Sequence, residues 1–186
     1  LGDVYKRQEI ICAGFGGQGV LVAGNILAFA GMEAGKIITW YPSYGSEMRG
    51  GTANCNIKIS DEEIASPYVK APDVLICLNE VSIGKFMDTM KPGATLVVNS
   101  SLCSPDYAFR DDIRVVRVPA SDIANELGNP RGLNIAALGA AVAASGMFDC
   151  EAFKGYIDKF FARKGKVNPK NGMCFDAGVK SVTGTK

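Results

Sequence analysis

Histidine is absent from this sequence of 186 residues. A chain without histidine cannot form the Ser-His-Asp or Cys-His pairs of the common hydrolases, and it lacks the usual general base for work near neutral pH. An excess of charge is absent as well, because 20 Lys and Arg residues face 19 Asp and Glu residues and the net charge is +1. Such a balance produces no long-range field for a polyanion, so we expect no nucleic-acid partner.

Closely spaced cysteines are also missing. The six cysteines stand singly along the chain, without any C-x-x-C pair, so there is no local ligand set for a structural zinc ion or an iron–sulfur cluster. We therefore expect no metal in this chain and reduced, mostly buried thiols, as in a cytoplasmic protein. The longest apolar stretches, residues 19–32 and 135–144, are shorter than the roughly 20 residues that a membrane span needs. We accordingly expect no membrane association.

The overall composition is typical of a folded domain. Hydrophobic residues make up 47% of the chain and charged residues 21%, as in ordinary globular proteins. The length suits one domain. We expect a single α/β domain over residues 9–186, preceded at residues 1–8 by a polar segment that is non-native or disordered.

Apolar runs alternate with helical stretches. We expect strands over residues 9–13, 36–41, 53–60, 73–78, 95–98 and 113–118, with Pro42 closing the second. The expected helices follow residue 19 and cover residues 80–90, 132–147 and 151–162, with a short helix capped by Ser121 or Asp122 and a short tail at residues 173–182. This alternation predicts a three-layer, mostly parallel, Rossmann-like sheet with helices on both faces.

The first expected strand leads into the string Gly14-Phe15-Gly16-Gly17-Gln18-Gly19 and then into a helix. Glycines in this context let the backbone approach a phosphate at the helix N-terminus. A dinucleotide site also needs an acid about 20 residues further on, after the second strand, but that strand ends Thr39-Trp40-Tyr41-Pro42. Two interpretations remain: a loop for another phosphate-bearing ligand, or tight packing of strand on helix without a ligand.

A second glycine-bearing loop follows the second strand, with the sequence Tyr44-Gly45-Ser46-Glu47-Met48-Arg49-Gly50-Gly51. Loops after strands often carry the sites of α/β proteins. The planar guanidinium of Arg49 is suited to a phosphate or a carboxylate. The alternative is a solvated turn with a local ion pair between Glu47 and Arg49.

Other polar residues also allow two interpretations, one as ligand contacts and one as ordinary structural or surface residues. Asn79 and Asn99 end two strands and should lie at one edge of the sheet, as ligand contacts or as turn residues. A basic group between the last helix and the tail is either a solvated surface or a phosphate contact; it comprises Arg163, Lys164, Lys166 and Lys170.

The two glycine-bearing strings, together with the stretch from Lys91-Pro92-Gly93 to Asn99-Ser100-Ser101, resemble the gamma subunit, or gamma domain, of thiamine-diphosphate-dependent 2-oxoacid:ferredoxin oxidoreductases. The resemblance covers residues 9–178, and the string from Tyr44 to Gly51 is its most specific element. It implies that the complete enzyme decarboxylates a 2-oxoacid, passes electrons to ferredoxin and transfers the acyl group to coenzyme A. It also implies that thiamine diphosphate and iron–sulfur clusters belong to partner alpha, beta and, where present, delta subunits, and that the isolated chain is inactive, without catalytic residues.

By the same resemblance, this module completes the coenzyme A side of the active site. The implied cofactor-binding residues are Gly14, Gly16, Gly17, Gln18, Gly19 and Arg49. The implied partner-facing or active-site-facing loop comprises Tyr44, Glu47, Arg49 and Gly50. The expected substrate is 2-oxoglutarate or pyruvate. Two alternatives stay open: a stand-alone Rossmann-type nucleotide-binding oxidoreductase, and a purely scaffolding subunit.

Overall fold

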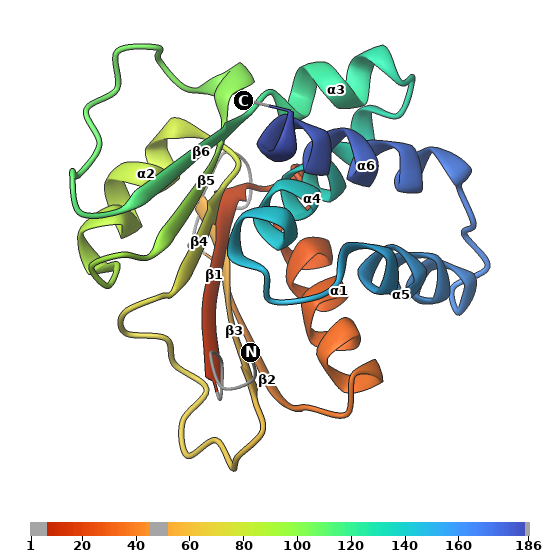
Figure 1. The fold of residues 1–186 in the computed structure, drawn as a ribbon, viewed down its shortest axis with the longest axis horizontal. Coiled ribbons are helices and arrows are strands. Elements are labelled where there is room, and N and C mark those ends of the chain that lie inside the picture. The colour runs from red at the N-terminus through yellow and green to blue at the C-terminus, as the bar shows by residue number, and fades with distance from the viewer. Residues whose placement is uncertain (1–6, 45–51, 185–186) are drawn as a thin grey trace.

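The computed structural model describes residues 7–44 and 52–184, and in this part of the chain six strands form one sheet with six helices around it (Figure 1). The strands are β1 (Arg7–Phe15), β2 (Ile37–Tyr44), β3 (Thr52–Ser60), β4 (Val74–Cys77), β5 (Thr95–Asn99) and β6 (Arg114–Val118). The helices are α1 (Val20–Glu33), α2 (Glu80–Phe86), α3 (Ala120–Glu126), α4 (Leu133–Ser145), α5 (Cys150–Ala162) and α6 (Pro169–Thr183). Short 3-10 turns are η1 (Met87–Thr89), η2 (Ser100–Leu102) and η3 (Pro130–Gly132).

The strand order is β2-β3-β1-β4-β5-β6. Strands β1, β4, β5 and β6 pair in parallel, whereas β3 pairs antiparallel with both β1 and β2. The connection from β2 to β3 is too short for the crossover that parallel neighbours require, so β3 turns back along β2. The mostly parallel sheet expected from the sequence is confirmed, with one reversed strand.

Helices cover both faces of the sheet, as expected. On one face, α1 and α4 pack against the strands, and α5 and α6 pack outside them (Figure 1). Their apolar core includes Ile10, Ile26 and Phe153. On the other face, α2 packs through Ile83 onto a second, smaller apolar cluster. The helical layer on the first face is therefore thicker than the layer on the second face. The glycine loop after β1 opens toward the thicker layer.

Several boundaries differ from the expected ones. Strand β1 begins at Arg7, inside the segment set aside at residues 1–8. Strand β2 continues through Pro42 to Tyr44, because β2 is an edge strand and a proline there costs no ladder hydrogen bond. The expected cap of α3 is wrong: Pro119 precedes the helix, and Ser121 instead bonds Asn99.

The expected short tail is the 15-residue helix α6. Its glycines disguise it in the sequence, because glycine is a poor helix former. In the fold they allow close packing, since a Cβ atom at Gly178 would overlap the carbonyl oxygen of Ala136 in α4. A Cβ atom at Gly139 would likewise overlap the carbonyl oxygen of Phe175. These bare surfaces let α6 and α4 pack backbone to backbone.

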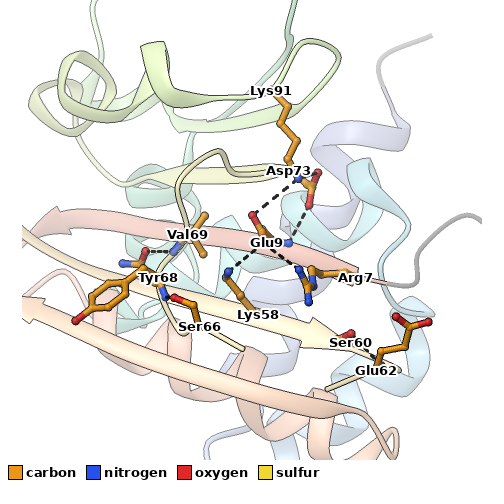
Figure 2. Close-up of polar contacts among 11 residues, drawn as sticks. Arg7, Glu9, Lys58, Ser60, Glu62, Ser66, Tyr68, Val69, Asp73 and Lys91 are labelled. Atoms are coloured by element: carbon orange, nitrogen blue, oxygen red, sulfur yellow. Dashed lines mark hydrogen bonds and ion pairs between the residues drawn. The ribbon is translucent and has the colours of Figure 1, made fainter. Parts of the chain in front are cut away.

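A charged cluster ties the sheet together at the start of β1, opposite the glycine loop (Figure 2). The carboxylate of Glu9 lies 3.1 Å from the ammonium of Lys58, whose side chain is only 8% exposed. Asp73 accepts a hydrogen bond from the Glu9 amide at 2.9 Å and another from the Lys91 ammonium at 2.8 Å. These contacts join β1, β3 and the start of β4, so the cluster belongs to the framework of the fold.

Candidate functional site

The glycine loop forms a tight link from β1 to α1. Gly17 and Gly19 have φ angles of 93° and 79°, in the left-handed region that favours glycine. Gly19 occupies the N-cap of α1, where no described side chain caps the helix and the first turn carries no acidic residue. The first backbone amides of α1 therefore keep their hydrogen-bonding capacity and the positive end of the helix dipole.

Gln18 fastens this loop to the neighbouring strand. Its side-chain oxygen accepts hydrogen bonds from the Phe15 amide at 2.7 Å and from Asn79 at 2.9 Å, and its amide nitrogen donates to the Leu78 carbonyl at 3.2 Å. Gly14 lies beneath it, where a Cβ atom would be 2.7 Å from the Gln18 side-chain oxygen. The structure thus uses Gln18 and Gly14 to hold the shape of the loop.

Asn79 and Asn99 lie at the same edge of the sheet, as expected from the ends of their strands. Asn79 caps α2 by accepting a hydrogen bond from the Ser82 amide at 3.0 Å. Asn99 donates to the Leu78 carbonyl at 3.1 Å and to the Ser121 hydroxyl at 2.9 Å. Both side chains join the polar contacts around the Gln18 amide, which favours their interpretation as structural residues.

A cavity of about 570 Å³ opens beside the glycine loop. Its walls are the loop, the first turn of α1, the η3 turn with the start of α4, and the connection from α5 to α6. Arg131 and Lys166 are the cations on these walls, and the described lining includes no carboxylate. Helix α4 also begins here without a side-chain cap or an acid in its first turn. Two helix N-termini and two cations make the cavity electropositive.

Asn134, in the first turn of α4, lies between the two helices. Its side chain donates a hydrogen bond to the Gly19 carbonyl at 3.0 Å. The residue is 3% exposed, and its side-chain oxygen is buried without a hydrogen-bond partner among the described residues. Buried polar atoms in native proteins almost always have partners. Because Asn134 also lines the cavity, a ligand with an N–H or O–H donor is a candidate partner for this oxygen.

Asparagines also position the wall that carries Arg131. Asn129 donates to the side-chain oxygen of Asn171 at 3.0 Å and accepts from Asn168 at 3.4 Å. These contacts fasten η3 to the start of α6. Sequence reasoning missed this wall because its residues come from segments far apart in the chain. Of the four basic residues considered as phosphate contacts, Lys166 is the one in the described lining.

Part of the expected site lies outside the described residues, namely Glu47, Arg49 and Gly50. Tyr44 ends β2, where its backbone pairs with Ala53 of β3. Ala53 lines the cavity. The segment of residues 45–51 thus connects β2 to a strand that lines the cavity, and the roles of its side chains stay predictions.

The described residues contain neither a cluster of metal ligands nor a membrane-spanning helix. Within residues 7–44 and 52–184, no group of three or more Cys, Asp or Glu side chains could hold a metal ion. No helix in the same ranges is long and apolar enough to cross a membrane. All six cysteines are free thiols, and five of them are buried.

Comparison with known proteins identifies relatives over almost the whole chain. The family model described as pyruvate ferredoxin/flavodoxin oxidoreductase matches residues 9–181. The ketoisovalerate oxidoreductase subunit VorA of Methanothermobacter marburgensis is 37% identical over 177 residues, covering 94% of this chain but 36% of that protein. The 2-oxoglutarate synthase subunit KorC of the same organism is 36% identical, covering 95% of this chain and 97% of its own length. The chain thus spans about a third of one relative and nearly all of the other.

Solved structures agree with this assignment. The gamma subunit of a keto/oxoacid ferredoxin oxidoreductase from Geobacter sulfurreducens superposes with a TM-score of 0.80 at 28% identity, covering 97% of this chain and 98% of that one. A 2-oxoglutarate:ferredoxin oxidoreductase from Magnetococcus marinus, with 2-oxoglutarate, coenzyme A and succinyl-CoA bound, shares the fold with a TM-score of 0.86 at 24% identity, covering 98% of this chain and 32% of that one. The family predicted from the two glycine-bearing strings is confirmed, and the chain belongs to the pyruvate ferredoxin/flavodoxin oxidoreductase family.

Proposed function

We propose that this chain is the gamma module of a 2-oxoacid:ferredoxin oxidoreductase and that the cavity beside its glycine loop receives coenzyme A. The observation that carries the proposal is the cavity itself, in which uncapped helix amides and an unpaired asparagine oxygen meet without any described carboxylate. Relatives named as subunits of ketoisovalerate oxidoreductase, 2-oxoglutarate synthase and pyruvate synthase support the activity. The bound coenzyme A of the Magnetococcus protein supports the ligand.

The chemistry of the cavity suits coenzyme A better than a bare anion. The amides at the start of α1 are suited to the pyrophosphate, because they combine hydrogen-bond donors with the positive end of the helix dipole. The Asn134 oxygen has no partner among the described residues, and coenzyme A supplies hydroxyl, amino and amide groups. The chain would thus bind and orient coenzyme A so that its thiol meets the acyl group.

The reacting groups themselves belong to other subunits in this proposal. The six cysteines are dispersed, and the described residues contain no group of three metal ligands, so this part of the chain does not fit an iron–sulfur cluster. Thiamine diphosphate and the clusters are accordingly assigned to the alpha, beta and, where present, delta subunits, with ferredoxin as the electron acceptor in the cytoplasm. The substrate in this proposal is 2-oxoglutarate or pyruvate, because relatives that this chain matches over most of their length are subunits of 2-oxoglutarate synthase and pyruvate synthase.

Gly16 offers a sharp test of the ligand. No described atom lies within 4 Å of a Cβ atom at Gly16, so a small side chain fits without displacing its neighbours. In the reconstituted complex, Gly16→Asp should raise the KM for coenzyme A about tenfold by charge repulsion. Gly16→Asn has the same shape without the charge, so its KM should stay within about threefold of the parent.

Other outcomes point to the alternatives. A Gly16→Asp complex that assembles and keeps the parent KM for coenzyme A would contradict the proposed ligand and favour a scaffolding subunit. NAD binding to the isolated chain, measured by calorimetry, would favour a stand-alone nucleotide-binding oxidoreductase. Purification of the chain from its native cells without thiamine-containing or iron-containing partners would contradict the proposed complex.

A further inference from the structure

Arg131 and Lys166 form a second positive region of the cavity, apart from the glycine loop. Arg131 belongs to η3, directly before α4, and Lys166 belongs to the connection from α5 to α6. Both side chains are exposed. Among the described residues, neither forms an ion pair with a carboxylate. Two unpaired cations on adjoining walls of one cavity favour an anionic group between them.

The start of α4 strengthens this region. Helix α4 has 13 residues and carries neither a side-chain cap nor an acid in its first turn, so its dipole adds positive potential close to Arg131. Asn134 belongs to the same turn and lines the cavity, and its side-chain oxygen, buried without a described partner, is a second observation that favours a ligand here. A hydroxyl or amino group beside the anion would satisfy that oxygen.

The wall that carries Arg131 is built to stay in place. A Cβ atom at Gly132 would lie 2.6 Å from the side-chain nitrogen of Asn129 and 2.7 Å from the sulfur of Cys174. Asn129 in turn bonds Asn171 at 3.0 Å. The backbone next to Arg131 is thus packed tightly onto α6, which presents the guanidinium from a fixed base and lowers the entropic cost of binding an anion.

We propose that Arg131 and Lys166 bind the 3′-phosphate of coenzyme A, while the glycine loop holds the pyrophosphate. This inference rests on the proposed function. The two anionic groups occupy different positions on the ribose of coenzyme A, and the two positive regions occupy different walls of one cavity of about 570 Å³, a size typical of small-molecule sites. The guanidinium presents paired donors that match phosphate oxygens, and the ammonium adds a second charge. The site would thereby distinguish coenzyme A from the same molecule without its 3′-phosphate.

Dephospho-coenzyme A provides the test. The KM values for coenzyme A and for dephospho-coenzyme A are measured with the reconstituted complex carrying the parent chain, Arg131→Gln or Lys166→Met. We expect the parent to prefer coenzyme A. Each variant should raise the KM for coenzyme A about tenfold, which is the usual effect of a lost charge-assisted hydrogen bond. The KM for dephospho-coenzyme A should stay within about twofold of the parent value. The control is Lys164→Met, which removes a nearby positive charge that does not line the cavity.

Three results would overturn the inference. One is an equal rise in KM for both ligands in Arg131→Gln and Lys166→Met, because the two cations would then contact a group that both ligands share. Another is a parent complex that does not discriminate between the ligands. The third is an effect of Lys164→Met as large as that of Lys166→Met, which would indicate a general charge effect. Failure of the proposed function has its own signature, since Gly16→Asp would then leave the KM for coenzyme A unchanged.

Discussion

The side chain of Asn134 donates a hydrogen bond to the carbonyl oxygen of Gly19, 3.0 Å away and 115 residues earlier in the chain. This contact joins the start of α4 to the N-cap of α1, so both helices present their first turns to the same cavity. The Asn134 oxygen meanwhile has no partner among the described residues. One side chain therefore shapes the glycine loop and leaves an acceptor unpaired beside the cavity.

Substitution of Asn134 should separate these two roles. Asn134→Ala loses the contact with Gly19 and the acceptor, and we expect it to raise the KM for coenzyme A about tenfold and to lower stability by about 1–2 kcal/mol. Asn134→Asp keeps the shape but places a carboxylate in an electropositive cavity, so its KM should rise further than that of the alanine variant. Steady-state kinetics of the complex and urea unfolding of the chain provide the two measurements. An aspartate variant with the parent KM would show that no anion binds nearby.

Gly19 should tolerate a side chain poorly for two reasons that a control can separate. Its φ angle is 79°, and a Cβ atom would lie 2.5 Å from the Asn134 side-chain nitrogen. Gly35 has a similar φ angle of 73°, but no described atom lies within 4 Å of its Cβ position. We expect Gly35→Ala to cost about 1 kcal/mol from backbone strain alone. Gly19→Ala should cost about 1–3 kcal/mol more from the added clash, and equal losses in urea unfolding would contradict this explanation.

The fold was largely predictable because its signals are local. Strand β4 is a continuous apolar run and α5 repeats its aromatic residues at helical spacing, so both are found close to their expected positions. Helix α6 was missed because its structure depends on a partner: glycines such as Gly178, which weaken an isolated helix, allow the backbone contact with α4. The reversal of β3 likewise depends on pairing that no single segment reveals.

The candidate site was predictable only in part, because only one of its walls comes from a local sequence signal. The string from Gly14 to Gly19 marks the loop between strand and helix, and the loop indeed lines a cavity. The opposite wall carries Arg131 and Asn134, more than 110 positions later in the chain, and nothing in their local sequence distinguishes them from a turn before a helix. Gln18 shows the opposite case, since a residue within the motif turns its side chain to internal hydrogen bonds.

The Glu9 and Lys58 pair should matter for stability, because both groups are largely withdrawn from water. Among the described residues, Lys58→Met leaves the Glu9 carboxylate with only the longer contacts to Arg7 at 4.0 Å and Lys91 at 3.9 Å. Removal of one partner of a buried ion pair typically costs about 3–5 kcal/mol. We expect a loss of about 3 kcal/mol here, because the partly exposed Lys91 remains close to the Glu9 carboxylate. Combining Lys58→Met with Glu9→Gln should restore part of the loss, because no unpaired charge remains. Urea unfolding of the single and double variants checks both expectations, and additive losses would contradict a direct coupling.

Cys150 should be the first cysteine to react in the native protein, and it should react slowly. It is the half-exposed member of the six, and burial, reinforced by the neighbouring Asp149 and Glu151 carboxylates, raises the pKa of its thiol. Burial also raises the pKa of Cys77. A raised pKa leaves less thiolate at a given pH, and the thiolate is the species that reacts. Mass spectrometry after iodoacetamide treatment near pH 7.5 should therefore show at most one adduct, at Cys150, in native protein and six in denaturant; early labelling of Cys77 would show that the sheet opens more readily than this packing implies.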